Sequence, residues 1–304
     1  MEYNISKFGL DKYRISPKLI YQTGVIPVEK EVLNLEEASA LLGVSSKTLL
    51  KMLREEEVPA RKIGREWRFS RSALLEWLAG GNSQEYVTAE KVVREYFDRL
   101  APEYDATRVK CYGSDLRNLV LDKVRVDKKM VVADIGCGTG YLTRGLAKKA
   151  KTVVAVDNSP EMLSIAQRGI REKEENVRFL LGEAGRLPLA ADSIDLLFAN
   201  MLLHHLIDPG EALREFARVL KPGGGVVITD VEEHPHQWLK KEKSDIWLGF
   251  DREELAEWLQ ESGFIAVEVA ELGCDCCTTS GSGREARIKS LIATGRKPEQ
   301  KTNA

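Results

Sequence analysis

The feature that most constrains the fold of this chain is an apolar strand that ends in an acid and a run of alternating glycines. Residues 130–133 are Met-Val-Val-Ala, Asp134 follows them, and Gly136-Cys137-Gly138-Thr139-Gly140 precedes a helix predicted from Tyr141. Glycine lets the backbone turn sharply and come close to a ligand, because no Cβ stands in the way. The pattern predicts a layered α/β domain with a ligand-binding loop at the end of this strand.

A second strand pattern carries another acid. Residues 152–156 are Thr-Val-Val-Ala-Val, and Asp157 follows them, 19 positions after Gly138. At this spacing a carboxylate can accept hydrogen bonds from the hydroxyls of a ribose. Taken alone, the loop and the acid describe a dinucleotide site equally well. The glycine spacing argues against that reading, since G-x-G-x-G lacks the x-x-G extension that receives a pyrophosphate.

With Asp134 before it, the loop resembles the first motif of class I S-adenosylmethionine-dependent methyltransferases. The further motifs follow in order as Asn158-Ser159-Pro160-Glu161-Met162-Leu163, Gly182-Glu183-Ala184, residues 195–200 and Leu220-Lys221-Pro222-Gly223-Gly224. The resemblance spans about residues 90–297. It implies an α/β fold with a Rossmann-like seven-stranded sheet whose last strand is antiparallel, and S-adenosylmethionine as the cofactor.

The resemblance also implies roles for individual residues. Asp134 would lie near the methionine amino group, Asp157 would hold the ribose hydroxyls, and Asn200 would lie beside the sulfonium. Glu183 would meet the adenine amine, although many relatives carry Asp there. We interpret Cys137 as a small packing residue rather than a nucleophile. The full predicted cofactor set is Asp134, Gly136, Cys137, Gly138, Gly140, Asp157, Asn158, Met162, Glu183, Ala184 and Asn200.

For the methyl acceptor, the domain resembles the small-molecule branch, which includes quinone, sterol and arsenite methyltransferases. Leu203-His204-His205-Leu206 carries this resemblance, and the chain lacks the Asn-Pro-Pro-aromatic motif of amino-methylating nucleic-acid enzymes. We predict Asn200, His205 and His234 as catalytic candidates. Since neighbouring side chains diverge, we expect one of His204 and His205 to face the sheet and the other to face away. Packing beside the cofactor and substrate contact are the two readings of this pair, and an exposed loop is the alternative for His234.

Three of the five cysteines fall within four positions, at Cys274, Cys276 and Cys277. They follow a strand predicted over residues 264–270, and the last strand is predicted over residues 288–294. Clustered thiolates bind soft ions such as trivalent arsenic, copper(I) or zinc, so these cysteines form a hypothetical metal or metalloid site. The alternative is a Ser/Gly-rich loop over residues 278–283 with incidental cysteines. The C-x-C-C spacing is not a four-ligand zinc pattern.

The N-terminal part has a different pattern. Asn34 and Glu37 have the spacing of a helix-capping pair, Gly43-Val44-Ser45 separates two short helical stretches, and residues 60–69 alternate around a two-residue turn. This part resembles the excisionase branch of MerR-like winged helix-turn-helix proteins. The resemblance implies DNA contacts by residues of the second helix and the wing, namely Ser46, Lys47, Thr48, Arg61, Lys62, Arg65 and Arg68.

Charge supports DNA contact only locally. Lys and Arg number 45 and Asp and Glu number 47, so the formal net charge is −2. Between Lys47 and Arg71, however, there are eight basic and four acidic residues. A basic patch is needed to bind phosphates. The alternatives for this module are protein contacts or capping of the substrate.

The predicted organisation follows from these segments. Residues 1–30 are a leader without an assigned role, 31–80 the winged helix-turn-helix, 81–88 a linker, 89–297 the methyltransferase domain and 298–304 a tail. Residues 89–128 are expected to form N-terminal cap helices. No apolar run approaches the ~18 residues that span a bilayer, and no signal-peptide core is present, so we expect a cytoplasmic protein with no membrane partner. The sequence leaves a homodimer open.

Three functions are consistent with these patterns. The leading hypothesis is an enzyme that methylates a small soft acceptor, a trivalent metalloid such as arsenite or a thiol, and carries a DNA-binding regulatory domain. The second is a transcriptional regulator whose methyltransferase fold senses the cofactor or a metalloid without turnover. The third is a nucleic-acid methyltransferase.

Overall fold

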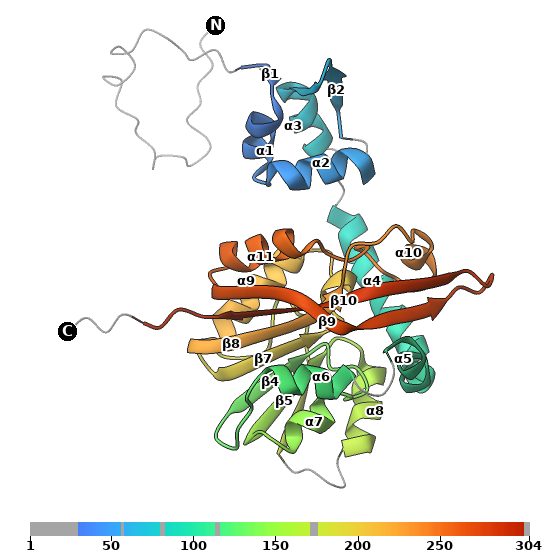
Figure 1. Ribbon diagram of the computed structural model, residues 1–304, viewed down its shortest axis with the longest axis vertical. Coiled ribbons are helices and arrows are strands. Elements are labelled where there is room, and N and C mark those ends of the chain that lie inside the picture. The colour runs from blue at the N-terminus through green and yellow to red at the C-terminus, as the bar shows by residue number, and fades with distance from the viewer. Residues whose placement is uncertain (1–29, 56–57, 80–82, 113–115, 171–175, 301–304) are drawn as a thin grey trace, which may run out of the picture. The chain divides into compact units, whose positions relative to one another are not determined.

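The computed structural model describes residues 30–55, 58–79, 83–112, 116–170 and 176–300 (Figure 1). The chain divides into two compact units, Met1–Asn82 and Ser83–Ala304, here called the N-terminal and C-terminal units. The predicted leader, apart from Lys30, lies outside the described residues, as do the last four residues of the predicted tail. The linker predicted at 81–88 is too long, because helix α4 (Ser83–Leu100) already begins at Ser83.

The N-terminal unit is a small winged helix-turn-helix, as predicted. Its elements are β1 (Val32–Leu33), α1 (Leu35–Leu42), α2 (Ser46–Glu55), β2 (Ala60–Ile63), β3 (Glu66–Ser70) and α3 (Arg71–Ala79). The strands pair antiparallel in the order β1-β3-β2. Apolar side chains from the helices and strands form one buried core, made of Leu33, Ala38, Leu49, Val58, Phe69 and Leu74.

Both ends of helix α1 are fixed by local capping residues. The Asn34 side chain accepts a hydrogen bond from the Glu37 amide (2.8 Å), and the Glu37 carboxylate accepts one from the Asn34 amide (2.9 Å). This reciprocal capping box satisfies two amides that the helix itself cannot pair. Gly43 ends the helix in the left-handed region at φ 70°. The capping prediction is therefore confirmed.

The C-terminal unit is built on a seven-stranded sheet in the order β6-β5-β4-β7-β8-β10-β9. Its strands are β4 (Val131–Ile135), β5 (Thr152–Asp157), β6 (Val177–Leu181), β7 (Ile194–Asn200), β8 (Leu220–Val231), β9 (Ile265–Thr279) and β10 (Glu285–Arg296). Strands β4 to β8 are parallel, and β10 runs antiparallel to both β8 and β9. The predicted seven-stranded sheet with an antiparallel last strand is confirmed.

Helices cover both faces of this sheet (Figure 1). Buried side chains of α6 (Leu116–Lys123) and α7 (Thr143–Ala147) share a core with one face, and those of α9 (Pro209–Val219) and α11 (Arg252–Glu261) share a core with the other. The remaining elements are the 3-10 helices η2 (Ala101–Glu103) and η3 (Leu203–His205) and the α-helices α5 (Tyr104–Tyr112), α8 (Pro160–Ile170) and α10 (Trp238–Glu242).

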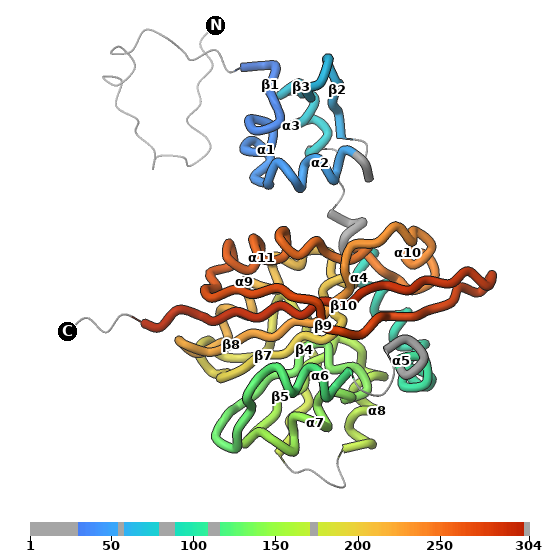
Figure 2. Tube along the Cα trace, viewed as in Figure 1, coloured from blue at the N-terminus to red at the C-terminus, as the bar shows by residue number. Residues whose placement is uncertain are grey.

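Strands β9 and β10 are much longer than predicted. They pair from Arg296 opposite Ile265 to Glu285 opposite Thr279, whereas β8 pairs with β10 only from Ser290 onward. The hairpin therefore continues past the rest of the sheet (Figure 2). As a consequence, the segment predicted to leave the sheet as a loop is mostly strand.

In the part of the chain that the structure describes, no helix combines the length and the apolar character needed to cross a membrane.

Replacing Asn34 with Ala is expected to destabilise α1 locally by about 1 kcal/mol, because the amides of the first turn lose their side-chain acceptor. Hydrogen exchange of peptides from α1, measured by mass spectrometry on the full chain, should then be roughly fivefold faster. Asn34→Asp keeps the acceptor and should exchange like the wild type. Equal rates in all three proteins would contradict the assigned cap.

Candidate active site

The glycine loop between β4 and α7 requires its glycines for two reasons. Gly136, Gly138 and Gly140 have φ values of 67°, 53° and 82°, in the left-handed region that other residues avoid. A Cβ at Gly136 would also lie 2.7 Å from Leu202 Cδ1, and one at Gly140 would lie 2.9 Å from Ile170 Cδ1. The loop is thus a tight turn at the carboxyl end of β4, with no room for side chains at these glycines.

Asp157, at the end of β5, ties this loop to its own strand. Its carboxylate accepts hydrogen bonds from the backbone amides of Gly138 (2.8 Å) and Ser159 (2.9 Å). Desolvation by burial raises its pKa to about 6 against the effect of these bonds. The structure therefore brings Asp157 and the glycine loop together.

Asp134 precedes the same loop and Cys137 belongs to it, and both side chains are buried. Asp134 is 1% exposed and accepts a hydrogen bond from the Thr143 hydroxyl. Desolvation and then the charge of Asp157 raise the pKa of Asp134 to about 7. Burial raises the pKa of the Cys137 thiol well above its usual value, and the side chain packs with Ala155 and Leu163. A buried, protonated thiol suits the packing role predicted for Cys137.

The other predicted cofactor residues lie at or after the ends of neighbouring strands, except Met162, which lies in α8. The Asn158 amide donates a hydrogen bond to the exposed Glu183 carboxylate (3.0 Å), so these two side chains meet. Met162 and Ala184 are buried, at 1% and 9% exposure. Asn200 ends β7, and its carbonyl oxygen accepts a hydrogen bond from the Thr229 hydroxyl on β8 (2.7 Å). These groups could hold a nucleoside along the edge of the sheet.

Two acids of the cap helices complete the rim, and the sequence reasoning missed both. Asp98 on α4 accepts a hydrogen bond from the Ser159 hydroxyl, and Asp105 on α5 accepts one from the Thr139 hydroxyl (2.6 Å). Ser159 lies in the loop after β5, and Thr139 lies in the loop after β4. An acid on an amphipathic helix gives no sequence signal that would point to such a distant hydroxyl partner.

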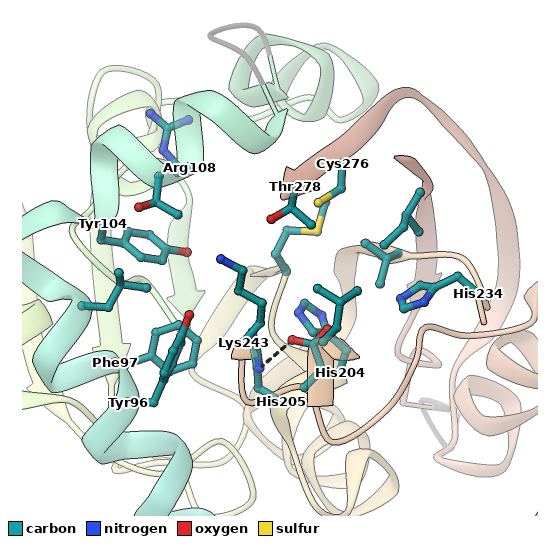
Figure 3. Close-up of a pocket in the computed structure, with 17 residues that line it drawn as sticks. Tyr96, Phe97, Tyr104, Arg108, His204, His205, His234, Lys243, Cys276 and Thr278 are labelled. Carbon is teal, nitrogen blue, oxygen red and sulfur yellow. Dashed lines mark ion pairs between the residues drawn. The ribbon is translucent and has the colours of Figure 1, made fainter. Parts of the chain in front are cut away.

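A pocket of about 90 Å³ opens beside the glycine loop (Figure 3). Tyr104 belongs to both, since it lines the pocket and a Cβ at Gly138 would lie 3.6 Å from its ring. Aromatic side chains of α4 and α5 form one wall, and polar side chains from η3, β9 and the loops after β8 form the others. The polar wall residues include His204, His205, His234, Lys243, Asp245, Cys276 and Thr278.

Both histidines of the Leu203–Leu206 motif face this pocket, which corrects the expectation that they diverge. They lie in the 3-10 helix η3 rather than in an extended segment, so successive side chains are not turned to opposite sides. Their ring centroids are 3.9 Å apart. His204 Nδ1 lies 2.6 Å from an Asp230 carboxylate oxygen, and His205 Nδ1 lies 3.1 Å from the Ser244 carbonyl oxygen.

The different surroundings of the two rings give them different protonation states. Burial alone would lower the pKa of His204, but the charge of Asp230 and its hydrogen bond outweigh burial and raise that pKa to about 9. Burial, and then the positive charge of His204, hold the pKa of His205 well below its usual value. His205 is thus neutral at physiological pH, and the Ser244 carbonyl requires that its proton be on Nδ1.

Two further side chains that line the pocket have buried nitrogens without hydrogen-bond partners among the described residues. His234 Nε2 and Arg108 Nε and Nη1 are buried, and none has a hydrogen-bond partner among the described residues. Burial, chiefly, lowers the pKa of His234 to about 4. Arg108 stacks on Tyr141, with its guanidinium carbon 3.4 Å from the ring centroid. Because unpaired buried donors cost free energy, this pocket suits a ligand that offers oxygen acceptors.

The three clustered cysteines do not form the predicted three-thiol site. They lie within strand β9, where Cys276 pairs with Ile288 and Cys277 with Arg287. Neighbouring side chains in a strand point to opposite faces, so Cys276 is buried in the pocket wall while Cys277 is exposed on the other side. Cys274 is half-buried. Only Cys276 of the three lines the pocket.

In the N-terminal unit, the predicted DNA-contacting residues differ in exposure. Lys47 on α2 and the wing residues Arg61, Lys62 and Arg65 are exposed, whereas Arg68 is half-buried and pairs with Glu66. Half-buried Ser46 starts α2. Thr48 is also half-buried, and its hydroxyl bonds the Ser45 hydroxyl at the start of the helix (2.7 Å). The exposed cations therefore lie mainly on the β2–β3 wing.

Comparison with known families agrees with both units. Residues 133–228 match the family described as methyltransferase domain, and residues 32–82 match the family described as helix-turn-helix domain. The chain carries a methyltransferase domain behind a helix-turn-helix domain. The first match covers the glycine loop, Asp157 and strands β4 to β7, and the second covers every described element of the N-terminal unit.

Two curated relatives match part of the chain. The chain is 32% identical over 191 residues to the chloroplastic 2-methyl-6-phytyl-1,4-hydroquinone methyltransferase of Spinacia oleracea, covering 62% of this chain and 54% of that protein. It is 33% identical over 154 residues to the ubiquinone/menaquinone biosynthesis C-methyltransferase UbiE of Campylobacter jejuni, covering 46% of this chain and 63% of that one. The chain thus spans less than two thirds of either relative.

A solved structure with the same fold is an N-methyltransferase 2 from Haemonchus contortus, in complex with phosphomonomethylethanolamine and S-adenosylhomocysteine. The two chains are 19% identical with a TM-score of 0.57, and the match covers 68% of this chain and 61% of that one. At this identity the likeness shows the shared fold.

The affinity for S-adenosylmethionine is expected to fall as the pH is lowered from about 8 to about 5. The pKa values of Asp134 and Asp157 are raised to about 7 and about 6, so both lose their charge in this range. Each required carboxylate should cost roughly tenfold in affinity per pH unit below its pKa. Calorimetric titration measures this. Asp192→Asn, at an exposed site, should keep the profile, and a pH-independent affinity in the wild type would refute the assignment.

Proposed function

We propose that residues 83–300 form an S-adenosylmethionine-dependent methyltransferase for a small acceptor. One observation carries the proposal: the glycine loop held by Asp157 and the pocket lined by histidines share Tyr104 as a common wall. A cofactor lying along the loop would therefore have its reactive end next to a bound acceptor. Proximity of this kind is the main catalytic contribution in a displacement reaction.

The residues of the chain have distinct parts in this proposal. When bound, S-adenosylmethionine supplies a methyl group already activated by its sulfonium. Asp157 and Gly138 hold the ribose side, Asp134 supports the loop, and Asn200 stands at the end of β7 where the two sites meet. His205, which is neutral with a protonated Nδ1, keeps a lone pair on Nε2 that can accept a proton from the acceptor.

The pocket favours an acceptor that combines a ring with oxygen substituents. Tyr96, Phe97 and Tyr104 offer ring faces and edges, and the unpaired nitrogens of Arg108 and His234 offer donors to oxygen. The two relatives are named for hydroquinone and quinone substrates, which have this chemistry. We therefore propose a quinol-like acceptor.

A soft acceptor, a thiol or a trivalent metalloid such as arsenite, is the second candidate. The observation in its favour is that Cys276 is buried in the pocket wall with His204 and His205. A thiol at this place could hold a soft atom next to the cofactor. Since Cys277 points to the opposite face, retention of the acceptor would depend on Cys276 rather than on all three cysteines.

For the N-terminal unit we propose DNA binding of the excisionase or MerR-like type, with α2 in the major groove and the wing along the backbone. Exposed Lys47, Arg61, Lys62 and Arg65 supply the positive charge. The unit would then link the expression of nearby genes to the chemistry of the methyltransferase domain.

Incubating the full chain with labelled S-adenosylmethionine and separate pools of hydroquinones, thiols, arsenite, DNA and RNA should label the hydroquinone pool. Asp157→Ala should lower kcat/KM by at least roughly tenfold, because two charge-assisted hydrogen bonds that shape the loop are lost. The exposed-site variant Asp192→Asn should retain activity.

Other outcomes of this assay separate the alternatives. Labelled thiol or arsenite that disappears in Cys276→Ser, but not in Cys277→Ser, favours the soft acceptor. Label in DNA or RNA overturns a small-molecule enzyme. If no pool is labelled and a promoter fragment binds with cofactor-dependent affinity, the chain is a sensor rather than an enzyme.

Replacing both Arg61 and Arg65 with Ala is expected to weaken binding to duplex DNA and to reduce the slope of log affinity against log salt by about 2, because each phosphate contact contributes about 0.9. Fluorescence anisotropy at several salt concentrations gives this slope. Lys128→Ala, an exposed charge in the C-terminal unit, serves as the control. An unchanged slope in the double variant would exclude the wing from the interface.

A further inference from the structure

A cluster of metal-ligating groups lies in the pocket wall, away from the clustered cysteines. One ring nitrogen each of His204 and His205 and one carboxylate oxygen of Asp245 all lie within 4.8 Å of one another. His204 and Asp245 are buried and His205 is half-buried. Ligand atoms around a zinc ion lie about 3.3 Å apart when its bonds are ~2.1 Å long, so small side-chain rotations would close this cluster on an ion.

Both histidines are held as metal-binding histidines usually are. A metal-ligating imidazole commonly gives its other ring nitrogen to a carboxylate or a backbone carbonyl, which fixes the orientation of the ring. His204 Nδ1 is held by Asp230 at 2.6 Å, and His205 Nδ1 by the Ser244 carbonyl at 3.1 Å. Asp230 also accepts the Leu203 amide (2.9 Å), which fixes the start of η3. Because Nδ1 of each ring is engaged in this way, Nε2 is the nitrogen left to bind an ion.

Asp245 supplies a second, independent observation. It is 8% exposed, and among the described residues no group donates a hydrogen bond to its carboxylate. Its approach to His205 Nδ1, at 3.9 Å, is longer than a hydrogen bond. A buried carboxylate without hydrogen bonds costs several kcal/mol, and a bound cation removes that cost.

We propose that His204, His205 and Asp245 bind one divalent transition-metal ion, such as Zn²⁺ or Fe²⁺, in the acceptor pocket. Two imidazoles and one carboxylate are a donor set that such ions accept with positions left open. The ion replaces the Nε2 proton of His204, since a coordinating imidazole nitrogen must be deprotonated. This site shares no residue with the cysteine cluster. His204 and His205 lie in η3 and Asp245 follows α10, whereas the cysteines lie in β9.

The three residues line the same pocket as Tyr104, His234 and Cys276. An ion held there would bind an oxygen of the acceptor and favour its ionised form, which makes the acceptor a better nucleophile. With the ion bound, this effect would replace proton uptake by His205, whose Nε2 the ion occupies. This role rests on the proposed methyltransferase function, whereas binding of the ion does not.

The test is metal binding to the full chain after dialysis against a chelator. Titration with Zn²⁺ by calorimetry, and with Co²⁺ by its visible spectrum, should give one equivalent bound with nitrogen and oxygen ligation. Asp245→Asn removes the charge at nearly constant shape and should weaken binding by at least roughly tenfold, as should His205→Gln. Asp230→Asn, which weakens the support of His204 and of the start of η3 without removing a ligand, should weaken binding by about tenfold.

Matched controls make the result decisive. His236→Gln changes a histidine in the loop after β8 outside this cluster, and Cys277→Ser changes the exposed thiol, so both should bind the ion like the wild type. The affinity for S-adenosylmethionine, measured without metal, shows that each variant is folded. The proposal is overturned if the wild type binds no stoichiometric ion, if Asp245→Asn binds as tightly, or if Cys277→Ser abolishes binding.

The two proposals fail separately. If the chelator-treated protein still transfers methyl groups and binds no ion on titration, the metal site is overturned and the methyltransferase function is retained. Stoichiometric ion binding without methyl transfer to any pool overturns the function and leaves the site.

Discussion

The hydrogen bond from the Gly138 amide to the Asp157 carboxylate is the constraint on which the rest of the site depends. It joins the loop after β4 to the end of β5, and it forms only because the glycines at 136 and 138 adopt positive φ values. Burying this carboxylate near Asp134 is costly, as their raised pKa values indicate. Such a cost is typical of positions kept for binding rather than for stability.

Around this bond, five separate stretches of chain converge. The cap helices α4 and α5 reach the two loops through Asp98 and Asp105, and Tyr104 lies between the loop and the pocket. The 3-10 helix η3 presents both histidines, and β9 adds Cys276 from the far end of the chain. Because the carboxyl ends of the parallel strands share one edge of the sheet, residues distant in sequence meet there.

The pocket has polar groups within a mainly apolar lining. Paired groups such as His204 and Asp230 are satisfied within the protein, while Arg108 Nε and His234 Nε2 have no hydrogen-bond partner among the described residues. The Asp245 carboxylate approaches His205 Nδ1 only to 3.9 Å. Buried groups of this kind are stable only with a bound counterpart or at a cost to folding. The oxygens of a quinol-like substrate would accept hydrogen bonds from Arg108 and His234, and a divalent ion would bind the Asp245 carboxylate.

The sequence by itself determined the local features: the strand and glycine loop, the acid at Asp157, the capping box at Asn34, and, through ordered motifs, the seven-stranded sheet. Each depends on residues a few positions apart, so local sterics and hydrogen bonding decide it. Only the tertiary structure decided which side chains face the pocket. His204 and His205 share a face because η3 is helical, Cys276 and Cys277 separate because β9 continues as a strand, and Arg108 comes from a helix with no motif. Non-local pairing of β9 with β10 sets the directions of the two cysteines, and no short-range pattern in the sequence reports this pairing.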